Sequence, residues 1–252
     1  MNEILLVSAA GLAAGAMNAA AGGGSFLSVP ALIYGGVSSV SANMSSTIAL
    51  YPGAIASGWA YRKSIQPIHG VSVKALFASS LTGGFLGALL LLFTPTSAFD
   101  KILPWLLLTG SLVFAFGPKI GARLKRLHEP NPTFLLIAQF FLGMYGGYYG
   151  GAVGIMMIAM WSMLGLDDMK TMNATKVVLV AGANTVAVVV FAISGSVAWR
   201  ETLVMMVTAI VGGYLGARVA MRLRSSQLRI GISVVNFVIV AIFFYAKYFR
   251  GF

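Results

Sequence analysis

Apolar stretches long enough to cross a membrane recur along this chain and constrain its fold more than any other feature. A transmembrane helix needs about 20 mainly apolar residues. The chain is 58% hydrophobic and only 9% charged, whereas about 25% of the residues in a soluble domain are charged. The sequence therefore predicts an all-α polytopic membrane protein in contact with the lipid bilayer. We expect its spans at about residues 4–20, 45–61, 71–94, 102–117, 134–150, 174–194, 202–219 and 230–248.

The scarcity of reactive side chains excludes several classes of function. The chain has no cysteine and two isolated histidines, His69 and His128, so we expect no disulfide, metal site or cofactor. None of the six acidic residues lies at the middle of a predicted span. An intramembrane enzyme would need a nucleophile with its base, paired carboxylates or a metal, so we expect no enzyme and no catalytic residues. Proton coupling through an intramembrane Asp or Glu is equally unsupported.

Basic residues are concentrated in short loops between the spans, which predicts the orientation of the chain. Lys and Arg are enriched in cytoplasmic loops, so three loops are expected there and both termini outside the cytoplasm. The net charge of +11 then reflects topology, and we expect no nucleic-acid partner. The start of the chain lacks the basic region of a signal peptide. The loop residues are Arg62, Lys63, Lys74, Lys119, Arg123, Lys125, Arg126, Arg218, Arg222, Arg224 and Arg229.

Two glycine-rich runs break the apolar pattern. The first lies in AGGGSFLSVP (21–30) and the second extends over residues 146–154. Each glycine costs a helix roughly 1 kcal/mol relative to alanine. The apolar piece after the first run, residues 26–36, would be about 16 Å long as a helix, about half the hydrocarbon thickness. This piece and a second at 152–165 are therefore predicted to be re-entrant or parts of broken helices.

The two halves of the sequence resemble each other, with a period of roughly 130 residues. SSVSANMSSTIAL (38–50) lies nearly against DDMKTMNATKVVL (167–179), with Asn43-Met44-Ser45 matching Asn173-Ala174-Thr175. Farther along, TGGFLGALL (82–90) matches VGGYLGARV (211–219). Each half has one broken hairpin without a net crossing and about three further spans, an odd number, so the halves should be inverted. Inverted repeats with broken helices are typical of secondary transporters. We expect a first repeat at 1–117, a basic cytoplasmic linker at 118–133 and a second repeat at 134–252.

The broken helices also predict an anion site, because a helix N-terminus presents free N–H groups and a positive dipole end. Two alternatives stay open at this point. The Asn, Ser and Thr residues could instead cap helices, and Lys176 could extend to the membrane surface rather than face the interior. Asn18 and Asn184 could line the cavity or join helices. The candidate substrate-binding residues are Gly22, Gly23, Gly24, Ser25, Asn43, Ser45, Ser46, Gly150, Gly151, Gly154, Asn173, Thr175 and Lys176.

The motifs resemble a known family. GAMNAAAGGGSFLSVPALIYGG (15–36) followed by ANMSSTIALYPG (42–53), with Asn-Ala-Thr-Lys at 173–176, is similar to the sulfite exporter TauE/SafE family, also called the 4-toluene sulfonate uptake permease family. The resemblance implies a transporter in the bacterial inner membrane, with the site between two inverted halves. In that membrane the two termini, expected outside the cytoplasm from the basic loops, would be periplasmic. Its implied substrates are sulfur-containing anions such as sulfite, sulfoacetate or other organosulfonates. One departure is Ala152-Val153, which interrupts the second glycine run.

An exporter of a small anion is the function we expect. An anion leaving a negative-inside cell gains about 2.3 kcal/mol per charge per 100 mV, so export would need no coupling ion. The alternatives are a passive anion channel, a permease for another small organic anion, and a structural or assembly subunit, which would not need duplicated helix breaks. The sequence also leaves a homodimer open.

Overall fold

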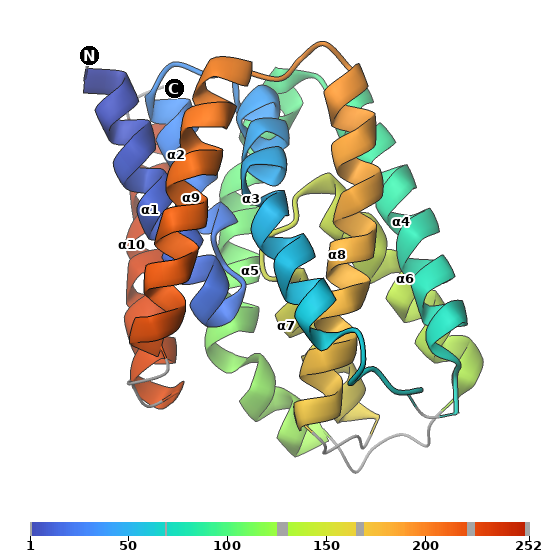
Figure 1. The fold of residues 1–252 in the computed structure, drawn as a ribbon. Helices are drawn as coiled ribbons and strands as arrows, with labels where there is room; N and C mark the ends of the chain where they lie inside the picture. The colour runs from blue at the N-terminus through green and yellow to red at the C-terminus, as the bar shows by residue number, and fades with distance from the viewer. Residues whose placement is uncertain (1, 69, 125–130, 165–168, 221–224, 250–252) are drawn as a thin grey trace.

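The computed structural model describes residues 2–68, 70–124, 131–164, 169–220 and 225–249, and this part of the chain forms a bundle of ten α-helices without a named strand (Figure 1). The all-α prediction is thereby confirmed. Five of the described helices, α1, α4, α5, α8 and α9, are long and apolar enough to cross a membrane. The helices are α1 (Asn2–Ala21), α2 (Ser25–Tyr34), α3 (Ser39–Tyr61), α4 (Val73–Phe93), α5 (Thr96–Leu124), α6 (Pro132–Tyr148), α7 (Val153–Met163), α8 (Met169–Ile193), α9 (Trp199–Ala220) and α10 (Ser225–Phe249).

The two ends of the bundle differ in charge. In Figure 1, α1 begins and α10 ends at the top, which we call the terminus end. Helices α3, α5 and α9 end at the bottom, which we call the basic end. Two balanced pairs lie near the starts of helices at the terminus end: Asp100 with Lys101 in the second turn of α5, and Arg200 with Glu201 in the first turn of α9. The described basic residues at or beside the helix termini of the basic end are Arg62, Lys63, Lys74, Lys119, Arg123 and Arg218, whereas Lys125, Arg126, Arg222 and Arg224 fall outside the described residues.

Two helices are too short to cross a bilayer. Helix α2 has 10 residues and α7 has 11, lengths of about 15 and 16 Å. Each directly follows a longer helix after a break of a few residues, at 22–24 and 149–152. Each returns toward the end of the bundle from which the preceding helix came (Figure 1). The structure thus has the two broken hairpins that the glycine runs predict.

Two helix boundaries differ from the sequence prediction. Helix α3 begins at Ser39, six residues before the expected start at 45, so Asn43 lies in its second turn and is not an N-cap. Helix α5 continues through Pro118 to Leu124, although its span was expected to end at 117. Part of the predicted linker is therefore helical. Apolar pattern alone misplaces both ends, because a helix can continue beyond the apolar stretch that crosses the membrane.

Glycines allow the closest helix packing in the bundle, where α4 lies along α6 and α1 along α9. A methyl group at Gly87 of α4 would overlap the backbone carbonyl of Met144 in α6. In the second pair, a methyl group at Gly212 of α9 would overlap the backbone carbonyl of Leu12 in α1. Small residues bring membrane helices together in this way. The similar GGxxG segments at 83–87 and 212–216 thus have the same packing role on different partners.

The helix order of α1–α5 recurs in α6–α10, with the short helix in second place each time. Packing partners recur as well. Helix α1 packs on α9, and its equivalent α6 packs on α4. Likewise α3 packs on α9, and its equivalent α8 packs on α4. Helices α3 and α8, the third helix of each set of five, also contact each other. These two long helices, together with the two breaks, surround the cavity described next.

Candidate functional site

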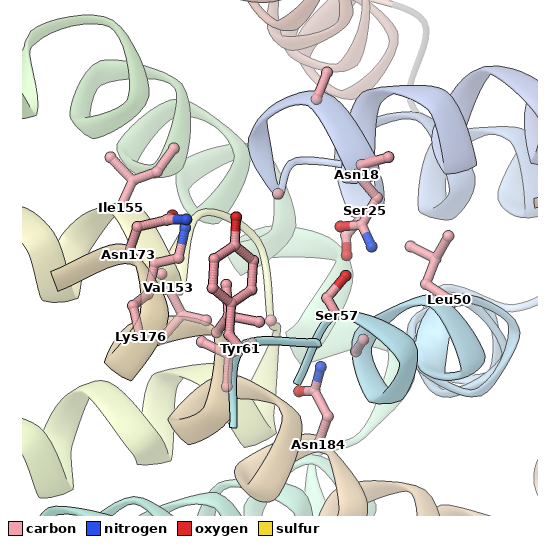
Figure 2. A pocket seen from close by; sticks show the side chains of 18 of the residues that line it. Asn18, Ser25, Leu50, Ser57, Tyr61, Val153, Ile155, Asn173, Lys176 and Asn184 are labelled. Carbon is pink, nitrogen blue, oxygen red and sulfur yellow. The ribbon is translucent and has the colours of Figure 1, made fainter. Parts of the chain in front are cut away.

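A cavity of about 320 Å³ lies between the two helix breaks and the long helices α3 and α8. Its wall is formed by the end of α1, the start of α2, one face of α3, the start of α7 and one face of α8 (Figure 2). The lining residues are Asn18, Ala19, Ala20, Gly22, Ser25, Thr47, Leu50, Ala54, Ser57, Tyr61, Gly150, Val153, Gly154, Ile155, Asn173, Lys176, Val177, Val180 and Asn184.

Left-handed backbone turns the chain at both breaks. Gly22 has a φ of +78° and Gly150 a φ of +80°, a region that residues with a side chain rarely adopt. Ala152 also has a positive φ, +61°, and is the residue before α7. This is the position where the sequence departs from a continuous glycine run. The turns let α2 and α7 begin beside the cavity instead of extending α1 and α6.

Both short helices present their N-termini to the cavity. Ser25 of α2 and Val153, Gly154 and Ile155 of α7 all line it. The first N–H groups of a helix have no partner within that helix. Here the N–H groups of Phe26 and Ile155 donate to the carbonyls of Gly23 and Ala152 in the breaks, so the N–H groups of Ser25, Val153 and Gly154 are the donors at these two ends. They also carry the positive end of the helix dipole, which favours an anion. The cavity therefore receives two such ends from parts of the chain about 130 residues apart.

Lys176 is the single charged residue among those that line the cavity in the described chain. It lies on α8, two turns from the start of that helix. Its aliphatic stem packs over Gly154 of α7, where an added methyl carbon would lie 2.9 Å from the lysine Cδ. The absence of a side chain at Gly154 thus makes room for the lysine. The structure places Lys176 on the cavity wall, beside the N-terminus of α7 (Figure 2).

Neutral polar side chains complete the lining. Asn18 comes from the last turn of α1 and Ser25 from the start of α2. Asn173 and Asn184 come from α8, and all four are labelled in Figure 2. Amides and hydroxyls donate hydrogen bonds without adding negative charge. With one cation and no carboxylate among the described lining residues, the site has the chemistry to bind an anion and disfavours a cation.

The structure divides the predicted site residues into two groups. The residues that line the cavity are Gly22, Ser25, Gly150, Gly154, Asn173, Lys176, Asn18 and Asn184. Those that do not line it are Gly23, Gly24, Asn43, Ser45, Ser46, Gly151 and Thr175. The three glycines of the second group, Gly23, Gly24 and Gly151, pack against protein atoms. Its polar side chains have hydrogen-bond partners in the protein.

Four polar residues of that second group bond within the protein. The Asn43 amide donates to the carbonyl of Tyr148, at 2.8 Å. The Ser46 hydroxyl lies 2.6 Å from that of Ser28. The other two, Ser45 and Thr175, bind loop backbone: Ser45 accepts from the N–H of Ala198 and Thr175 from the N–H of Gln66. These contacts hold helices and loops together.

One face of α3 was missed by the sequence analysis. Thr47, Leu50, Ala54, Ser57 and Tyr61 all line the cavity, and their spacing of three and four residues places them on one side of the helix. The signal was present as Thr47, Ser57 and Tyr61 within an apolar span. Tyr61 resembles an interfacial aromatic anchor because it lies near the end of the span, but its ring faces the cavity (Figure 2).

Comparison with known proteins agrees with these features. The family model described as "Sulfite exporter TauE/SafE" matches residues 7–243. The chain is 29% identical over 233 residues to a probable membrane transporter protein of Haemophilus influenzae, covering 92% of this chain and 90% of that protein. It is 28% identical over 230 residues to the probable membrane transporter protein YfcA of Escherichia coli K12, covering 90% of this chain and 84% of that protein. No solved structure gives a significant match. The chain belongs to the TauE/SafE sulfite exporter family.

Proposed function

We propose that this protein is a multi-pass transporter of the bacterial inner membrane that exports a small sulfur-containing anion. Sulfite or a small organosulfonate such as sulfoacetate would bind between the two broken helices. The observation that carries the proposal is the cavity itself, where two helix N-termini and Lys176 meet without a carboxylate among the described lining residues. Family membership and relatives named as probable membrane transporters support it.

The size of the cavity supports a small substrate. Its volume of about 320 Å³ equals that of roughly ten water molecules at about 30 Å³ each. A small oxyanion with several waters fits this space, which lies at the lower end of the range of about 300–1,000 Å³ typical of ligand pockets. The described lining has no His, Cys, Asp or Glu, so we propose transport without chemical conversion of the substrate.

The position of the cavity supports export. It extends along α3 from Thr47 to Tyr61, the last residue of that helix. Tyr61 lies at the basic end, and the positive-inside rule places this end in the cytoplasm. The cavity therefore loads from the cytoplasmic side in this conformation, and both termini lie in the periplasm. Release of an anion to the outside is favoured by the membrane potential.

Flux measurements in proteoliposomes test this proposal. Labelled sulfite and labelled sulfoacetate are each offered to vesicles with and without the protein. A transporter shows saturable uptake, and unlabelled substrate inside the vesicles accelerates it by counterflow. Flux that rises linearly with concentration, without counterflow, would show a passive channel. If folded protein moves neither anion in either assay, the proposed substrate class is wrong.

A further inference from the structure

Hydrogen bonds in the two halves correspond to each other. Ser45 of α3 and Thr175 of α8 occupy matching places in the aligned triplets Asn43-Met44-Ser45 and Asn173-Ala174-Thr175. The Ser45 hydroxyl accepts from Ala198 in the α8–α9 loop, at 3.1 Å. The Thr175 hydroxyl accepts from Gln66 in the α3–α4 loop, at 3.3 Å. Each long helix therefore holds the loop that follows the other one, which supports the alignment of Asn43 with Asn173.

The helix ends at the breaks correspond in the same way. Tyr148 lies two residues before Gly150, and Ala20 lies two residues before Gly22. Both glycines have a φ close to +80°. The carbonyls of Tyr148 and Ala20 are thus equivalent groups, one at the end of each broken helix. The pair formed by Asn43 and the Tyr148 carbonyl therefore has an equivalent pair in the other half, formed by Asn173 and the Ala20 carbonyl.

The two equivalent pairs are in different states. Asn43 is 1% exposed and its amide donates to the Tyr148 carbonyl, at 2.8 Å. Beneath this contact, the hydroxyls of Ser28 and Ser46 bond to each other in the interior. In the other pair, Asn173 and Ala20 both line the open cavity. The structure is therefore closed toward the terminus end and open toward the basic end.

The closed contact is also incompletely satisfied. The Oδ1 atom of Asn43 is buried without a hydrogen-bond partner in the described chain. A buried acceptor without a partner carries a cost, so separation of Asn43 from Tyr148 would regain solvation for that oxygen. The contact between Asn43 and Tyr148 can therefore close this end and still separate reversibly.

We propose that Asn43 and Asn173 are the two gate residues of the transporter. In the conformation described here, the bond from Asn43 to the Tyr148 carbonyl closes the terminus end. In the opposite conformation, Asn173 donates to the Ala20 carbonyl and closes the basic end, while the bond from Asn43 opens. This inference rests on the proposed transport function, because two alternating gates around one site are the means by which inverted repeats move a substrate.

Cysteine cross-linking tests the gate, because the chain has no cysteine of its own. The double variant Ala20→Cys/Asn173→Cys is reconstituted and oxidised with copper phenanthroline. A disulfide requires Cα atoms about 4.4–6.8 Å apart, so it forms when the basic end closes. We expect the cross-link to form, to stop at least nine-tenths of the flux that the reduced variant shows, and to release that flux after reduction. Flux in the reduced variant without any cross-link on oxidation would overturn the proposal.

A second measurement uses accessibility instead of flux. Ser46→Cys lies beneath the closed contact and is labelled with a membrane-impermeant thiol reagent from the terminus end. We expect Asn43→Ala to raise the labelling rate at least tenfold, whereas Ser97→Ala, a change at an exposed residue in the first turn of α5 at the same end, should leave it unchanged. An unchanged rate in Asn43→Ala would also overturn the proposal.

These readouts separate the gate from the substrate. Cross-linking and thiol labelling need no anion. If the cross-link forms and Asn43→Ala exposes Ser46→Cys while neither sulfite nor sulfoacetate is transported, the gate is supported and the substrate class is wrong. If an anion is transported but both gate tests fail, the transport function is supported and the gate is wrong.

Discussion

Replacement of Lys176 by methionine should weaken anion binding without disturbing the fold. Methionine keeps a long unbranched side chain over Gly154 and removes the positive charge. Lys176 is the only charge among the described lining residues, so no neighbouring cation on that wall compensates for its loss. The effect on affinity therefore reports the attraction between this ammonium group and the substrate.

The size of the effect follows from the dimensions of the cavity. A sphere of about 320 Å³ has a radius of about 4 Å, so an anion inside it lies about 4 to 8 Å from the lysine nitrogen. With an effective permittivity of about 20, Coulomb's law gives about 4 to 2 kcal/mol over that range. A change of 1.4 kcal/mol is a factor of ten in affinity. We therefore expect Lys176→Met to raise KM by roughly 30-fold to 1,000-fold.

Concentration-dependent uptake of sulfite into proteoliposomes measures this change. Lys63→Met is the matched control, because Lys63 is exposed in the turn after α3 and does not line the cavity. Its KM should stay within about twofold of wild type, since exposed charges are strongly screened. Lys176→Arg, which keeps the charge, should recover most of the loss. A KM for Lys176→Met within threefold of wild type would refute the reasoning.

Three further changes test the packing and the turns. Gly87→Ala should lower the free energy of unfolding in detergent by about 1–3 kcal/mol, because its methyl group would overlap the α6 backbone. The control Gly53→Ala, whose methyl group points to open space, should not lower it. Thermal unfolding compares the two variants. Gly154→Ala should displace the Lys176 stem and raise KM for sulfite roughly fivefold, a change of about 1 kcal/mol, with unfolding unchanged. Gly22→Ala should cost about 1 kcal/mol from its positive φ alone, seen as a lower unfolding midpoint, because nothing lies within 4 Å of the added methyl carbon.

The sequence predicts the broken helices because their causes are local. Three adjacent glycines at 22–24 and an apolar piece half the thickness of a bilayer require a break whatever surrounds them. Ser25 could be predicted as a site residue for the same reason, because it directly follows the first break, and it lines the cavity. For these elements, chain geometry and the thickness of the membrane are enough.

The roles of Asn43 and Asn173 could not be separated in the same way. Their sequence contexts are alike, and both were expected to contact the substrate. In the structure, Asn43 bonds to a helix end and Asn173 faces the cavity. This difference is a property of the tertiary arrangement, which places Asn43 against the end of α6 and Asn173 at the cavity.

Tyr61 shows a second limit of sequence analysis. An aromatic residue at the end of a span has the same pattern whether it faces lipid or an internal cavity. Its direction depends on the rotation of α3 about its axis, which the contacts with α8 and α9 determine. Those contacts are distant in sequence, so the cavity-lining face of α3 could be recognised only from the structure.

The position of a bound anion tests the central claim most directly. A structure determined by electron cryomicroscopy with saturating sulfite, compared with one without it, locates that anion by difference density. The account predicts new density in the cavity, within hydrogen-bond distance of the N-terminal turns of α2 and α7 and beside the ammonium group of Lys176. Density outside this cavity, or an unchanged cavity in protein shown to transport sulfite under the same conditions, would contradict the account.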